Sequence, residues 1–161
     1  MLKYRKGKQM KLPTVKGSNL KRQKMVFPDN FAGTINLVFV AFLRRHQDLI
    51  DEWVPFVEQL TQENPQFHYY EFPILPRRGP IYRTFLNEGM RAGIPNNATR
   101  ARTITLYLDK RAFRKALDID NEQNMWVYLF DKSGDVLWRT EGRFTKDKSE
   151  ALLKAVNQIS Q

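Results

Sequence analysis

Residues 36–53 read Asn-Leu-Val-Phe-Val-Ala-Phe-Leu-Arg-Arg-His-Gln-Asp-Leu-Ile-Asp-Glu-Trp, and this stretch decides the fold. Ile35 to Phe42 is almost continuously apolar, which is typical of a strand buried on both faces of a sheet. Apolar residues recur at helical spacing from Gln47 to Gln62. The stretch therefore predicts a buried strand, a short basic turn at Leu43–His46 and an amphipathic helix.

Further strands and helices are expected along the rest of the chain. The turn chemistry of Ser133-Gly134 predicts a β-hairpin, because glycine tolerates the positive φ that such turns need. The order of elements indicates an α/β fold with helices on both faces of a mixed sheet. The expected strands are 67–75, 103–108, 125–130 and 136–140, and the expected helices are 81–90, 110–117 and 148–159. Residues 12–28 should form short extended pieces around a turn at 17–19. Residues 96–102 should form a polar loop.

Length and composition bound the class of protein. A chain of 161 residues with 42% hydrophobic residues is about one domain with a substantial core. It contains no cysteine, which excludes disulfides, thiolate zinc sites and cysteine-based catalysis. No apolar run predicts a transmembrane helix or a secretory signal. The expected location is cytoplasmic, with an organellar origin left open.

The net charge of +10 is concentrated near the N-terminus. Residues 1–24 contain nine Lys or Arg residues and no acidic residue. We expect residues 1–11 to be a basic flexible arm and residues 12–161 to be the folded domain. Residues 1–24 are either a solvated segment or a contact surface for an acidic partner, nucleic acid or anionic lipid.

The order of elements resembles the thioredoxin-like superfamily, in its peroxiredoxin and thiol-disulfide oxidoreductase branch. That resemblance implies a three-layer α/β/α sandwich with an N-terminal extended extension, here residues 12–33. It also implies a reactive cysteine at the turn 43–46 and a cis-proline just before the closing hairpin. Neither is present, because the turn has no cysteine and the matching stretch is Gln123-Asn124-Met125-Trp126. The resemblance therefore implies the fold without its usual redox chemistry.

A second resemblance is narrower. The residues 103–109, 126–131 and 136–142 read Thr-Ile-Thr-Leu-Tyr-Leu-Asp, Trp-Val-Tyr-Leu-Phe-Asp and Val-Leu-Trp-Arg-Thr-Glu-Gly. They are similar to the mitochondrial ATP-synthase assembly factor family, which is also thioredoxin-like and acts as an assembly chaperone. This similarity implies a protein partner and no enzymatic activity.

The candidate binding residues are basic. Arg44, Arg45 and His46 lie where a strand gives way to a helix N-terminus, and such positions favour anions. The alternative is an exposed basic loop in which Asp48 and Asp51 serve as local partners. Arg77 and Arg78 follow the second strand of the core, where ligands often bind in α/β folds, or they belong to a solvated loop. The two histidines give no metal signature, and no cofactor motif is present.

Three functions fit these residues. The first is a non-redox thioredoxin-like binding or assembly protein. The second is a nucleic-acid or anion-binding protein that uses the basic N-terminal segment. The third is an enzyme that uses His46 as a base beside an anion held at the turn. We rank them in this order, so neither catalytic residues nor cofactors are expected.

Overall fold

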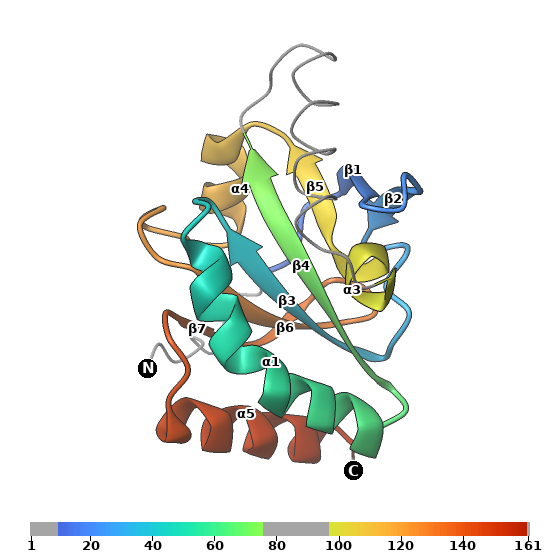
Figure 1. Ribbon diagram of the computed structural model, residues 1–161, viewed down its shortest axis with the longest axis vertical. Helices are drawn as coiled ribbons and strands as arrows, with labels where there is room; N and C mark the ends of the chain where they lie inside the picture. Colours follow the sequence, from blue (N-terminus) through green and yellow to red (C-terminus); the bar gives the residue numbers. More distant parts are fainter. Residues whose placement is uncertain (1–9, 76–96, 161) are drawn as a thin grey trace.

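The computed structural model describes residues 10–75 and 97–160. Its centre is a sheet of seven strands in the order β2-β1-β5-β4-β3-β6-β7 (Figure 1). The strands are β1 Val15–Asn19, β2 Lys24–Phe27, β3 Ile35–Ala41, β4 Phe67–Leu75, β5 Ile104–Tyr107, β6 Trp126–Asp131 and β7 Val136–Glu141. The helices are α1 His46–Glu63, α3 Asn97–Arg102, α4 Lys110–Ala116 and α5 Lys146–Ile159.

The sheet is mixed, and β3 lies near its middle. β3 pairs in parallel with β4 and antiparallel with β6, so Phe39 has Glu71 on one side and Val127 on the other. β4 and β5 are also parallel, and the remaining pairs are antiparallel. Residues 35–40 are all buried, as the continuous apolar run predicts for a central strand.

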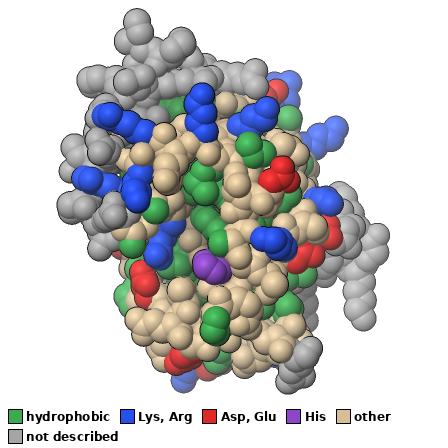
Figure 2. Space-filling model, turned by 90° about the vertical axis from the view of Figure 1, so that its right-hand side faces the viewer, with side chains coloured by type: hydrophobic (Ala, Val, Ile, Leu, Met, Phe, Trp, Pro, Cys, Tyr) green, Lys and Arg blue, Asp and Glu red, His purple; other side chains and the backbone are tan. Residues whose placement is uncertain are grey.

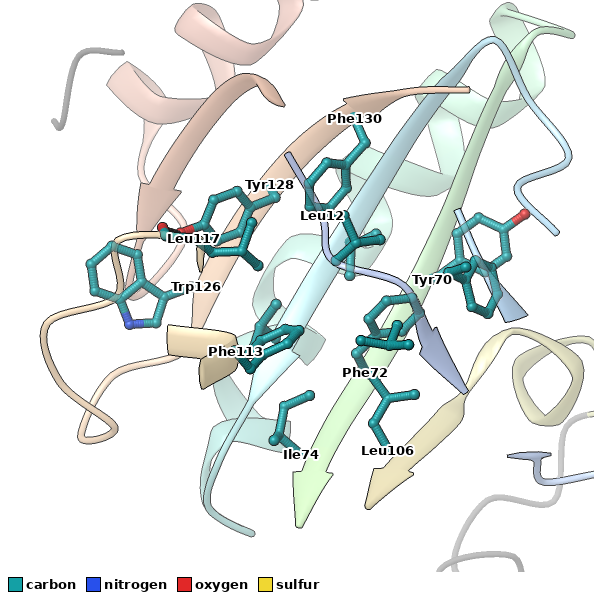
Figure 3. Close-up of a cluster of buried hydrophobic side chains, with 14 of the residues drawn as sticks. Leu12, Tyr70, Phe72, Ile74, Leu106, Phe113, Leu117, Trp126, Tyr128 and Phe130 are labelled. Carbon is teal, nitrogen blue, oxygen red and sulfur yellow. Dashed lines mark hydrogen bonds between the residues drawn. The ribbon is translucent and has the colours of Figure 1, made fainter. Parts of the chain in front are cut away.

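Two hydrophobic cores lie on opposite faces of the sheet because side chains alternate along each strand. Leu37 and Phe39 face α1 and α5, where they meet Trp53 and Leu152. Val38 and Val40 face the other side, which is covered by α4 and the N-terminal segment. Figure 3 shows side chains from the sheet, α4 and this segment converging on that second core. The three-layer α/β/α architecture is therefore confirmed.

The N-terminal segment is held by the closing hairpin. Met10 is 7% exposed, and its carbonyl accepts a hydrogen bond from the Val136 N–H at 2.9 Å. The Leu12 N–H donates to the Gly134 carbonyl at 2.8 Å, and Lys11 forms an antiparallel bridge with Asp135. Met10 and Lys11 thus pack with the domain, and residues 1–9 of the expected arm lie outside the described residues.

The turn expected at residues 17–19 is wrong. These residues belong to β1, and the turn follows at residues 20–23, where the Asn19 side-chain oxygen accepts from the N–H groups of Lys21 and Gln23, each at 3.0 Å. Gly17 lies opposite Leu106 of β5, so close that an added Cβ would approach the Leu106 side chain to 2.7 Å. The glycine therefore permits strand packing, not a change of direction.

Residues 97–102 form the short helix α3 instead of the expected polar loop. This helix is attached to the β1–β2 hairpin, because the Asn19 side chain donates to the Ala101 carbonyl at 3.1 Å and the Leu20 N–H donates to the Arg100 carbonyl at 3.0 Å. The helix expected at 81–90 lies outside the described residues, as do Arg77 and Arg78. The hairpin at Ser133-Gly134 is confirmed, with Gly134 at φ 93°.

Candidate functional site

The turn after β3 does not present its three basic residues together. Arg44 and Arg45 are exposed, whereas His46 is fully buried at the first residue of α1. The His46 side chain is turned into the protein, so anion binding at the turn stays a prediction that only Arg44 and Arg45 can meet from the surface.

His46 joins the turn to the loop before β6. Its Nδ1 accepts hydrogen bonds from the N–H groups of Phe42 at 3.0 Å and Leu43 at 3.3 Å. Its Nε2 lies 3.0 Å from the Gln123 carbonyl oxygen. Because Nδ1 accepts, the ring proton is on Nε2 and is donated to Gln123. Burial lowers the pKa of His46, and this favours the neutral ring that the bonding pattern requires.

Arg45 strengthens the same connection. Its Nη2 donates to the carbonyl oxygen of Gln123 at 3.2 Å and to the side-chain oxygen of Gln123 at 3.1 Å. Gln123 stands in the loop where the resemblance places a cis-proline, and the cis peptide bond found in the described residues is elsewhere, at Phe27–Pro28. We call His46, Arg45 and Gln123 the turn–loop clasp. It occupies the region of the fold where thiol chemistry is usual.

Arg44 differs from its neighbours. It is exposed, and within residues 10–75 and 97–160 it forms no ion pair. Of the two local partners expected for it, Asp51 instead accepts a hydrogen bond from the Gln47 side chain at 3.0 Å. Of the predicted turn residues, Arg44 is thus the one available to a partner.

A groove of about 590 Å³ begins beside the clasp. Gly142 forms part of its floor in a left-handed conformation, φ 83°, and an added Cβ would lie 3.3 Å from the Asn124 amide. The groove is lined by Leu49, Asn124, Thr140, Glu141, Gly142, Arg143 and Lys148. Sequence reasoning missed it because α1, the loop before β6, β7 and α5 contribute residues that are distant in the chain.

The polar groups of the groove suit binding. The Lys148 ammonium group donates to the carbonyls of Glu141 at 2.5 Å and Arg143 at 3.0 Å, and burial lowers its pKa. One carboxylate oxygen of Glu141, Oε2, is buried without a hydrogen-bond partner. A buried polar atom without a partner is costly to the folded state. The groove is therefore lined in part by the charged residues Glu141, Arg143 and Lys148.

A buried carboxylate lies beneath α1. Glu71 is 3% exposed, and its Oε1 accepts from the Gln47 side chain at 3.2 Å. Burial raises the pKa of Glu71, although the Gln47 hydrogen bond opposes this shift. Among the residues that the structure describes, no cluster of His, Asp and Glu is suited to hold a metal ion, and no helix is long and apolar enough to cross a membrane.

Solved structures share this architecture. A DsbF homologue from Corynebacterium diphtheriae has a TM-score of 0.65 at 11% identity, covering 98% of this chain and 91% of that one. The thioredoxin domain of a thiol-disulfide oxidoreductase from Bacteroides vulgatus has a TM-score of 0.60 at 15% identity, covering 94% and 97%. BsSco, a member of the Sco family of cytochrome c oxidase assembly proteins, has a TM-score of 0.60 at 12% identity, covering 91% and 94%.

These similarities and the clasp define a thioredoxin-like protein without cysteine. The model of the ATP10 protein family matches residues 2–159, so the chain belongs to this family. No curated protein sequence gives a significant match. The resemblances to the thioredoxin-like superfamily and to the assembly factor family are both confirmed.

Proposed function

We propose that this protein is a non-enzymatic assembly factor of the mitochondrial ATP synthase, which binds an unassembled subunit. The observation that carries the proposal is the ATP10 family match along nearly the whole chain. The turn–loop clasp supports it, because side chains that would otherwise bind or react at the turn are used to hold the protein together. Membership of this family also favours mitochondria over the cytoplasm.

The absence of cysteine gives this proposal a biochemical consequence. Insulin reduction and peroxide consumption both require a thiolate, and the chain has none. His46 is a poor general base, since both of its ring nitrogens are already hydrogen-bonded. We therefore expect purified protein to give background rates in both assays. Robust activity would contradict the non-enzymatic function.

The groove that begins beside the turn–loop clasp is the proposed contact with the subunit. Arg44 is exposed and forms no ion pair within the described residues, and the groove is lined by Glu141, Arg143 and Lys148. An extended segment of a partner could lie in this groove and place an acidic group against Arg44. None of the proteins reported above is described as binding nucleic acid, and nothing in the comparisons supports that alternative.

Co-purification tests this function. Tagged wild type should recover newly synthesised ATP synthase subunits from mitochondria, and Arg44→Ala/Arg45→Ala should recover less. The matched control is Lys146→Ala/Lys154→Ala, which removes two exposed charges from α5. Equal recovery by both double variants would mean that the turn is not part of the binding site. Failure of wild type to recover any subunit would contradict the assembly function itself.

A further inference from the structure

A second surface, away from the groove, has the character of a docking site. It consists of the β1–β2 turn, α3 and the first half of β4, and we call it the basic face. Figure 2 views this side of the molecule and shows Lys and Arg side chains around a strip of apolar side chains. The hydrogen bonds from Asn19 and Leu20 to α3 make it one continuous surface.

The two described segments that form most of the basic face carry basic residues without acidic ones. Residues 10–28 contain five basic residues and no acidic one, and residues 97–108 contain Arg100 and Arg102 and no acidic one. Lys21 and Lys24 are exposed and form no ion pair within the described residues. Cations crowded in this way repel each other and attract an anionic partner.

The basic face also contains a hollow. β5 pairs with β4 at Ile74 and Leu75 and reaches Glu71 through a single bridge, so within the described chain residues 67–70 have a strand on the β3 side alone. α3 borders the open side and leaves a cavity of about 280 Å³. It is lined by Thr61, His68, Tyr69, Tyr70, Ala98, Ala101 and Arg102.

Arg102 is the cation that lines this hollow, and it forms an ion pair with Glu58 within the protein. The Arg102 guanidinium lies over the Tyr69 ring, 4.1 Å from its centroid. Its Nη1 is 3.4 Å from the Glu58 carboxylate, which also accepts from the Tyr69 hydroxyl at 2.6 Å. A contact of 3.4 Å is long for a charge-assisted hydrogen bond, so an incoming carboxylate could compete with Glu58.

We propose that the basic face binds an acidic, extended segment of a partner protein and that Arg102 receives one of its carboxylates. The concave shape distinguishes this occupant from other anions. Tyr69 and Tyr70 are 4% and 6% exposed, so these rings are recessed and cannot enter a bilayer or stack on bases. A side chain of a polypeptide can enter such a hollow while neighbouring carboxylates meet the lysines.

This inference rests on the proposed function only in requiring a protein partner, and its test does not need the ATP synthase. The probe is a fluorescent peptide of alternating Glu and Tyr, titrated with the full chain and followed by anisotropy. Its counterpart has Gln in place of Glu. We expect the acidic peptide to bind, the Gln peptide not to bind, and the affinity to fall as salt is raised.

Charge reversal locates the site. Lys21→Glu/Lys24→Glu should weaken binding about tenfold or more, since attractive contacts become repulsive. Lys146→Glu/Lys154→Glu changes the net charge equally on α5 and should leave binding within about twofold. Circular dichroism and thermal unfolding verify that both variants fold. An equal loss in both variants would show a non-specific charge effect and overturn the proposal.

A gain in affinity is the sharper outcome. Glu58→Gln keeps an oxygen acceptor for the Tyr69 hydroxyl but removes the internal competitor of Arg102, so binding should tighten about two- to fivefold. Unchanged or weaker binding would show that Arg102 does not bind a carboxylate of the peptide. Vesicles with anionic phospholipid and single-stranded RNA are assayed in parallel, and binding of either one without binding of the peptide would also overturn the proposal.

Discussion

His46 has a structural role at the turn after β3. A neutral imidazole accepts two backbone N–H bonds and donates one, so it satisfies the sharp turn after β3 and fastens the loop before β6. A basic triplet in the sequence does not reveal this orientation. The N–H groups that His46 accepts from belong to Phe42 and Leu43, which precede the helix, and the rules for helix starts therefore do not reveal this role.

We expect His46→Ala to lower the free energy of unfolding by about 2–4 kcal/mol, because it leaves buried polar groups without partners. Urea denaturation measures this change. The exposed neighbour provides the control, since Arg44→Ala should stay within about 0.5 kcal/mol of wild type. If the two variants unfold alike, the clasp has no energetic importance.

The same residue gives stability a pH dependence. The pKa of His46 lies below its ordinary value of 6.5 because the ring is buried. The unfolded chain therefore binds this proton more readily than the folded one. The contribution of His46 is complete above pH 6.5 and declines as the pH falls from 6.5 toward the folded pKa. The free energy of unfolding, measured by denaturation at several pH values in this range, should vary less with pH for His46→Ala than for wild type.

Glu71 has the opposite effect. Its pKa is raised above the ordinary value of 4.5 by burial, so the folded state holds a proton that the unfolded state has released. The stability that this group contributes is lost as the pH rises from 4.5 through the folded pKa. At neutral pH the folded protein bears the cost of a buried charge. Glu71→Gln should therefore stabilise the protein by about 1 kcal/mol at neutral pH. Thermal unfolding below pH 4.5 should show no such gain.

At the scale of elements, α5 depends on a defined start. The Thr145 hydroxyl accepts from the Lys148 N–H at 3.2 Å and caps the helix that supplies Lys148 to the groove. Thr145→Ala should lower the free energy of unfolding by about 1 kcal/mol, whereas Thr145→Ser should retain most of it. Chemical denaturation of both variants checks this. Equal losses would assign the effect to the threonine methyl group.

The elements also show where sequence patterns succeed. β3, α1 and the hairpin of β6 and β7 were predictable because hydrophobic periodicity and a Ser-Gly turn are local signals. α3 was not, because its six residues form a helix through attachment to Asn19 and Leu20, which are remote in sequence. The groove and the basic face could not be predicted either, because residues that are remote in sequence form them. Long-range packing creates both surfaces.

At the scale of the whole molecule, the sheet separates two cores. Leu12 packs on the α4 side and Leu152 on the α1 side, and both are at most 2% exposed. Leu12→Ala and Leu152→Ala should each cost about 2–5 kcal/mol, because they leave cavities. Since the sites share no contacts, the double variant should equal the sum within about 0.5 kcal/mol. A larger deviation in equilibrium unfolding would mean that the sheet transmits strain between its faces.

The place of β3 in the sheet constrains when the protein can fold. One neighbour, β4, follows soon after it in the chain, but the other, β6, ends only at Asp131. The segment from Met10 to Leu12 likewise cannot form its hydrogen bonds until the turn at Gly134 has been synthesised. A nascent chain that has not yet delivered these residues carries an apolar strand with an unprotected edge, which is a template for aggregation. During its own synthesis the chain therefore passes through an interval in which a chaperone would protect it.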